Sequence, residues 1–256
     1  MEYYSKRIPI KKQDIEKIIR SFEDGEYLYN EYEKEHPTKT HNGRGQSIWN
    51  RIFTELDKNF MRDGYQVGII KRGLWEALYI YDENSRYLYT FMRYKNFTNL
   101  QNRKPENKLF HYANVLSTLN DSLKGMYQPE YEQISFIKEL PLDEDTDKEL
   151  KKLLNKMVSK ISSEIERYVI VTVEQKKGKI EDIQCIIPTF NMDTMYSESW
   201  NEFINVHYED ETSVIEPAVE ENTEINLVFK QPPINLIVKE KKAQEKDCES
   251  EEINHL

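Results

Sequence analysis

Apolar residues recur every three or four positions in four stretches of the chain, which is the spacing that places them on one face of an α-helix. The faces consist of Ile15, Ile18, Ile19 and Phe22; of Ile48, Trp49, Ile52, Phe53, Leu56 and Phe60; of Leu109, Tyr112, Leu116, Leu119 and Leu123; and of Leu150, Leu153, Leu154, Met157, Val158, Ile161 and Ile165. The first helix is expected to stop near Gly25, before a polar loop over 27–39. Ser47 is expected to cap the second helix, and the acidic run 143–147 the fourth. The third helix is expected to span 107–124.

After residue 64 the period of the apolar residues changes to two, which is typical of strands. Five strands are predicted, near 67–69, 75–80, 87–91, 168–173 and 180–187. The polar turns between them are short, and short loops cannot make parallel crossovers, so pairing is expected to be antiparallel. The sequence therefore predicts a single α+β domain over residues 1–206, in which amphipathic helices cover a mainly antiparallel sheet.

The last 50 residues differ from the rest of the chain in charge. Residues 207–256 hold 13 acidic and 5 basic side chains, so −8 of the total charge of −10 lies there, and a flexible acidic tail is predicted. Two apolar triplets flank Pro232-Pro233 within it: Leu227, Val228 and Phe229, then Leu236, Ile237 and Val238. The segment 225–238 is either a strand pair that extends the domain or a docking segment that folds on a protein partner. The sequence leaves both interpretations open.

No complete catalytic or metal-binding motif occurs in the chain. The five histidines are scattered, and no G-x-S-x-G string marks a nucleophile elbow. Cys185 lies in an apolar run that predicts a buried thiol and Cys248 lies in the tail, so neither a zinc site nor a disulfide is expected. No apolar run approaches the roughly 18 residues of a membrane span, and the N-terminus lacks the apolar region of a signal peptide. We therefore expect a cytoplasmic protein without a membrane contact, a cofactor or a bound metal.

Basic and aromatic residues are concentrated between residues 41 and 104, where 11 Lys and Arg accompany 6 Asp and Glu. The candidates for nucleic-acid or anion binding are Arg44, Lys71, Arg72, Trp75, Arg86, Arg93 and Lys95. The interleaved tyrosines, expected to share one face of a hairpin, are Tyr79, Tyr81, Tyr87, Tyr89 and Tyr94. Cations beside aromatic rings on a sheet are used to bind single-stranded nucleic acid. Aromatic residues also pack under helices. We favour packing, because two predicted helices need a surface to cover.

Two further strings have a chemical interpretation and a simpler one. The string 42–47 places Arg44 between two glycines before a helix, where backbone N–H groups can face a phosphate. A plain helix-entry turn is the interpretation we favour. Glu174-Gln175-Lys176 is similar to the E-x-K element of metal-dependent nucleases, which also needs a converging carboxylate. Glu164 and Glu166 are near in sequence, but they are predicted to lie at a helix end, so we favour polar residues of a hairpin.

Four strings along the chain resemble one known family. They are Asn-Gly-Arg-Gly at 42–45 followed by Trp49, Lys-Arg-Gly-Leu-Trp-Glu at 71–76, Tyr-Leu-Tyr-Thr-Phe-Met-Arg at 87–93 and Ser-Trp-Asn-Glu-Phe-Ile at 199–204. Together they resemble an uncharacterised family of bacterial and prophage proteins, over about residues 10–206. The resemblance implies no reaction. It implies a mobile-element setting, such as toxin–antitoxin or phage–host conflict, which is an association rather than a mechanism.

Two functions are compatible with these observations. The first is a non-enzymatic protein-binding or regulatory protein of a toxin–antitoxin or phage–host conflict system, whose acidic tail docks on a basic partner. The alternative is a nucleic-acid-binding protein or nuclease-type toxin that uses the basic aromatic segment 41–104. We favour the first function, because the chain holds no complete catalytic motif.

Overall fold

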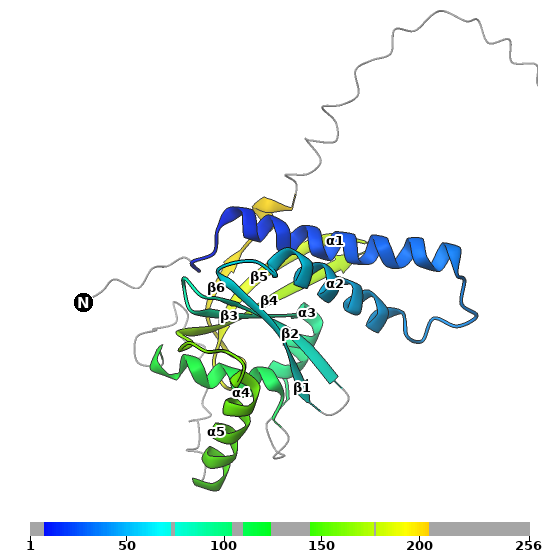
Figure 1. Ribbon diagram of the computed structural model, residues 1–256. Coiled ribbons are helices and arrows are strands. Elements are labelled where there is room, and N and C mark those ends of the chain that lie inside the picture. The colour runs from blue at the N-terminus through cyan, green and yellow to red at the C-terminus, as the bar shows by residue number, and fades with distance from the viewer. Residues whose placement is uncertain (1–7, 73–74, 104–109, 124–143, 177, 205–256) are drawn as a thin grey trace, which may run out of the picture. The chain divides into compact units, whose positions relative to one another are not determined.

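The central sheet has six strands, which lie in the order of the sequence in the computed structural model (Figure 1). They are β1 (Tyr65–Arg72), β2 (Trp75–Asp82), β3 (Tyr87–Arg93), β4 (Arg167–Lys176), β5 (Lys179–Pro188) and β6 (Thr194–Ser199). All neighbours are antiparallel except β3 and β4, which are parallel. The α+β class, the mainly antiparallel sheet and the five expected strands are therefore confirmed. The periodicity missed the edge strand β6, in which only Met195 is buried.

The structure describes residues 8–72, 75–103, 110–123, 144–176 and 178–204. The chain divides into two units after residue 215, and every described residue belongs to the first. The predicted tail and its candidate docking segment 225–238 lie outside the described residues, so their interpretation stays a prediction. None of the described helices combines the length and the apolar composition of a membrane span.

Two N-terminal helices cover one face of the sheet (Figure 1). They are α1 (Lys12–Glu35) and α2 (Arg44–Phe60). The prediction that the first helix stops near Gly25 is wrong, and most of the expected loop over 27–39 is helical. Gly25 instead lies where the two helices cross, since a Cβ there would stand 2.5 Å from Cγ1 of Ile52. The glycine therefore allows close helix packing and does not end the helix.

The connection from β3 to β4 covers the opposite face. It contains α3 (Tyr94–Gln101), α4 (Tyr112–Ser117), the 3₁₀ helix η1 (Thr118–Leu123) and α5 (Glu144–Val158). Outside this connection, a second 3₁₀ helix, η2 (Asn201–Phe203), follows β6. The single helix expected over 107–124 is thus divided into α4 and η1 within its described part. The tighter η1 brings buried Asn120 onto the strands, where its amide donates to the carbonyls of Tyr168 (2.9 Å) and Pro188 (3.0 Å). The fourth helix ends at Val158, before the expected limit of its apolar face.

Both faces of the sheet are buried, so the strand tyrosines pack in two cores. Ile80 lies opposite Tyr89 and both pack under α1 and α2, whereas Tyr81 lies opposite Leu88 under the crossover helices. Tyr79 joins the second core. The expectation of one aromatic face is therefore wrong, because the antiparallel register places these tyrosines on opposite faces. The packing interpretation of the buried tyrosines is confirmed.

The sheet opens between β2 and β3. These strands pair only from Asp82 opposite Tyr87 to Tyr79 opposite Thr90. Beyond that point the first residues of β2 pair with β1 alone, and the last residues of β3 pair with β4 alone. Figure 1 shows the β1–β2 hairpin diverging from β3 toward its turn. We call this region the open end; it consists of 71–72 and 75–76 of the hairpin and 91–93 of β3.

Candidate functional site

Three adjoining cavities lie at the open end. The hairpin cavity (about 920 Å³) lies between α2 and the β1–β2 hairpin. The central cleft (about 590 Å³) lies in the gap between the hairpin and β3, and the basic pocket (about 730 Å³) lies beyond the ends of β3 and β4. Gln46, Phe53, Glu76 and Ala77 line both the hairpin cavity and the central cleft, and Asn99 lines both the central cleft and the basic pocket. The cavities therefore form one continuous surface.

The central cleft is lined by apolar and polar residues in about equal number. Ile70 and Ala77 come from the hairpin, Phe91 and Met92 from the end of β3, and Trp49 from α2. The polar side chains of the crossover connection that line it are Asn96, Asn99, Arg103 and His111. Small-ligand sites are concave and combine apolar walls with convergent polar groups.

Trp49 connects the central cleft to the basic pocket. Its ring is packed edge-on against Phe22 and Phe53, with centroids 5.6 and 5.4 Å away. The guanidinium carbon of Arg93 lies 5.9 Å from the centroid of the Trp49 ring, a cation–π distance. Because Arg93 lines the basic pocket, this contact joins the aromatic wall of the cleft to a cationic pocket.

Three cations from three different elements line the basic pocket. Arg44 is the first residue of α2, which begins before the predicted cap Ser47. Arg93 ends β3, and Lys95 lies in the first turn of α3. The ends of β3 and β4 lie at the same edge of the sheet because these two strands are parallel. The sequence predicted all three cations as candidates, and the fold brings them together.

Arg44 is held in place by acidic and amide partners on α1. Its Nη2 lies 3.6 Å from a carboxylate oxygen of Glu26 and 3.4 Å from Oδ1 of Asn30. The guanidinium carbon is also 5.8 Å from the ring centroid of Tyr29. These contacts fix Arg44 at the rim and partly neutralise its charge.

Arg93 and Lys95 have no ion-pair partner among the described residues. A Cβ at Gly45 would stand 3.5 Å from Nη2 of Arg93, so the guanidinium lies against the bare backbone at the start of α2. Glu174 from β4 also lines the pocket, which therefore holds three cations and the two carboxylates of Glu26 and Glu174. The unpaired cations are the groups best able to bind an anion, because they lose no existing ion pair on binding.

A buried hydroxyl pair lies where the β2–β3 pairing ends. The hydroxyl oxygens of Thr90 and Tyr168 are 2.7 Å apart. Tyr112 lines the central cleft and packs in the same core. Burial raises the pKa of Tyr112 and that of Tyr168. Both phenols therefore stay protonated to a higher pH than an exposed tyrosine does.

The hairpin candidates lie at the same open end as the basic pocket. Nζ of Lys71 pairs with Glu76 at 2.8 Å, and both side chains are exposed. Arg72 and Trp75 are the residues that end β1 and begin β2, opposite one another in the register. Their side chains lie outside the described part of the structure. Lys71 therefore contributes to the hairpin cavity, and no role follows for the other two.

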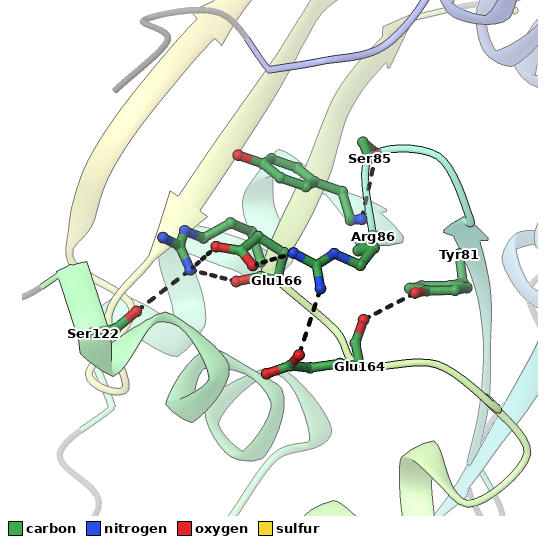
Figure 2. Close-up of polar contacts among 8 residues, drawn as sticks. Tyr81, Ser85, Arg86, Ser122, Glu164 and Glu166 are labelled. Carbon is green, nitrogen blue, oxygen red and sulfur yellow. Dashed lines mark hydrogen bonds and ion pairs between the residues drawn. The ribbon is translucent and has the colours of Figure 1, made fainter. Parts of the chain in front are cut away.

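Arg86 lies at the other end of β3, away from the cavities. Figure 2 shows its guanidinium bridging Glu166 at 3.1 Å and Glu164 at 3.4 Å, in the segment that leads into β4. The Tyr81 hydroxyl donates to the Glu164 carbonyl at 2.9 Å, and Arg167 reaches the Ser122 hydroxyl at 3.4 Å. Arg86 thus ties the β2–β3 turn to the β4 entry, and the structure does not bring it to the site.

The carboxylates considered for a nuclease do not converge. Glu166 directly precedes β4 and Glu174 lies near the end of that strand, so about eight strand residues, or about 26 Å, separate them. Glu164 lies in the connector after α5, and not at the helix end that the sequence predicted. Within the described residues, no group of three or more His, Cys, Asp and Glu side chains is placed to hold a metal ion. Cys185 is buried as predicted.

Several lining residues were missed by the sequence analysis. Asn96, Asn99 and Arg103 recur at intervals of three and four, which is the spacing of one helix face. The sequence therefore contained a signal for this polar group. It was overlooked because α3 has only one buried residue, Phe97, and so lacks an apolar period. Tyr112 was assigned to an apolar helix face, although it also lines the central cleft.

Comparison with known proteins identifies the family of the chain. No curated protein matches it, and no solved structure does. A family model matches residues 7–255, so the match extends through the acidic C-terminal region, beyond the span of the resemblance seen in the sequence. The expected membership of an uncharacterised family is confirmed, whereas the mobile-element setting stays a prediction. The chain belongs to the family of unknown function DUF5986.

Proposed function

We propose that the protein binds nucleic acid at the open end of its sheet. The observation that carries the proposal is the convergence of Arg44, Arg93 and Lys95 in one pocket, at the carboxyl ends of parallel strands. Two of these cations are without ion-pair partners among the described residues, and phosphate groups are their natural ligands. The adjoining aromatic cleft supplies the second element of a nucleic-acid site, a surface for bases.

The two carboxylates of the pocket restrict how a phosphate chain can lie. Glu26 is paired with Arg44, whereas Glu174 lies on the β4 side. A phosphate is attracted by Arg93 and Lys95 and repelled by Glu174, so it is directed toward the start of α2 and the central cleft. The site is therefore selective in position rather than a broad basic face.

The test is the salt dependence of binding to an oligothymidylate about 12 nucleotides long, measured by fluorescence anisotropy. The variant Arg44→Ala/Arg93→Ala/Lys95→Ala removes three cations of the pocket. A matched control, Lys58→Ala/Lys148→Ala/Lys151→Ala, removes three exposed cations that form surface ion pairs elsewhere. Each phosphate contact on a single strand contributes about 0.7 to the slope of log K against log salt. We expect the pocket variant to lose about two units of slope and the control to keep the wild-type slope. Equal slopes in all three proteins would refute the proposal.

A second candidate function, protein binding, is favoured by one observation. Tyr27, Leu28 and Tyr32 on the C-terminal half of α1 are 62, 37 and 48% exposed. Grouped exposed apolar residues are typical of protein interaction sites. This supports a regulatory protein, of the kind expected for a toxin–antitoxin or phage–host conflict system. A stoichiometric partner that copurifies with the wild type and is lost with Leu28→Ser/Tyr32→Ser would support it, and a partner retained by that variant would not.

A further inference from the structure

We infer that the central cleft receives one unstacked base of a single strand, while the adjacent phosphate lies in the basic pocket. The inference rests on the proposed function and specifies its ligand. Asn99 lines both cavities, and Arg93 of the basic pocket contacts the ring of Trp49 in the cleft. A nucleotide carries an anion and an aromatic ring on one sugar, so its two parts match two directly connected sites.

The size and walls of the cleft suit a nucleobase. Its volume of about 590 Å³ falls within the usual range for small-ligand pockets. The gap between β2 and β3 is bounded by Ala77 on one side and by Phe91 and Met92 on the other, so a base in the cleft would lie between two strand edges. Trp49 adds an aromatic wall, and bases of any identity stack on aromatic side chains.

Polar groups around the cleft can contact the edge of a base. The amides of Asn96 and Asn99 each supply donors and an acceptor, the combination that reads base edges. The strand edges add backbone groups, because residues of β2 before Tyr79 pair only with β1 and residues of β3 after Thr90 pair only with β4.

The geometry favours a single strand over a duplex. In a duplex, each base is stacked and paired, and it can enter a cleft inside a sheet only after leaving the helix. The cations of the basic pocket lie beside the cleft mouth and do not form a long stripe that follows two backbones. The site therefore accepts a strand whose bases are already free.

The experiment is an abasic scan with the full-length protein. Fluorescein-labelled oligothymidylates about six nucleotides long carry an abasic residue at each position in turn, and their anisotropy is compared with that of the intact strand. Stacking contributes enough per base that its loss weakens binding about fivefold or more. We expect one position to show this loss and the others to bind like the intact strand. A duplex of the same sequence is expected to bind at least about tenfold more weakly.

The variant Asn96→Ala/Asn99→Ala tests whether the sensitive base lies in the central cleft. Both residues are exposed on α3, so the fold is retained. In this variant the penalty at the sensitive position should shrink, while the salt slope stays that of the wild type. Uniform binding of every abasic strand, or a duplex that binds as tightly as the single strand, would overturn the inference and leave the proposed function standing. An intact strand that does not bind at all would overturn both.

Discussion

Replacing Gly25 by alanine gives two opposing effects, and the structure decides which is larger. Alanine in a helix interior is favoured over glycine by about 1 kcal/mol. Its Cβ, however, would stand 2.5 Å from Cγ1 of Ile52 and 2.7 and 2.8 Å from the backbone N and Cα of the same residue. Carbon atoms in contact are about 3.5–4.0 Å apart, so the overlap is about 1 Å. A side-chain rotation of Ile52 cannot remove it, because two of the three atoms belong to the backbone.

Relief therefore requires α1 and α2 to move apart, which disturbs a crossing where Phe22 and Ile52 are fully buried. Overpacking of this kind costs about 1–3 kcal/mol, and backbone contacts place Gly25→Ala at the upper end. After the gain in helix propensity is subtracted, we expect a net loss of about 2 kcal/mol in the free energy of unfolding. Urea denaturation followed by far-ultraviolet circular dichroism measures this loss as a lower midpoint with an unchanged slope.

Gly45→Ala is the matched control, because Gly45 is also helical but its nearest non-local atom would be 3.5 Å from the new Cβ. Only the propensity effect operates there, so the control should be stabilised, by up to about 1 kcal/mol. Opposite signs for the two variants are the expected result. A Gly25→Ala protein as stable as the wild type would refute the claim that close helix packing requires the glycine.

Two further predictions concern the core on the crossover side. Asn120→Ala removes two amide donors to the carbonyls of Tyr168 and Pro188 and the acceptor of the Tyr168 N–H. Three buried backbone groups then lose their partners, at a cost of about 1–3 kcal/mol each. Urea denaturation should therefore show that the free energy of unfolding falls by about 3 kcal/mol or more. A fall of less than about 1 kcal/mol would contradict this prediction. Burial raises the pKa of Tyr112 and of Tyr168, so above pH 10 the folded chain retains protons that the unfolded chain releases. The free energy of unfolding should therefore fall as the pH rises above 10, by up to about 1.4 kcal/mol per pH unit for each tyrosine. Tyr168→Phe should make this pH dependence less steep, and an unchanged pH dependence would contradict the prediction.

Local periodicity was sufficient for the elements whose burial is one-sided or whose turns are short. The apolar face of α2 and the β1–β2 and β4–β5 hairpins lie where the pattern of apolar and polar residues predicted them. The parallel pairing of β3 with β4 was not predictable in this way, because more than 70 residues separate these strands and no local pattern records which edges meet. The predicted helix end at Gly25 is wrong for a related reason. The glycine is needed for its contact with Ile52, which is distant in the sequence.

At the candidate site, too, the sequence shows which residues are charged, whereas the fold decides which of them come together. Arg93 and Arg86 were chosen for the same reason, as cations beside strand tyrosines. They flank β3 at opposite ends, about 23 Å apart for a seven-residue strand, so only Arg93 reaches the cavities. Asn99 carried no charge to mark it, yet it lines two of the three cavities. Residue type identified the cations, whereas topology selected among them.

The opening between β2 and β3 does not result from residues unsuited to pairing. Neither 75–78 of β2 nor 91–93 of β3 contains proline or glycine. Continuing the observed register past Tyr79 and Thr90 would place Glu76 opposite Arg93, and opposite charges across a strand pair are favourable. Instead Glu76 pairs with Lys71, and Arg93 lies on Trp49 without a carboxylate partner among the described residues. The fold thus gives up ladder hydrogen bonds and an ion pair at the point where a cleft and a cationic pocket meet. Departures from locally favourable structure are concentrated at functional sites, so the opening itself is an argument that this end of the sheet binds a ligand.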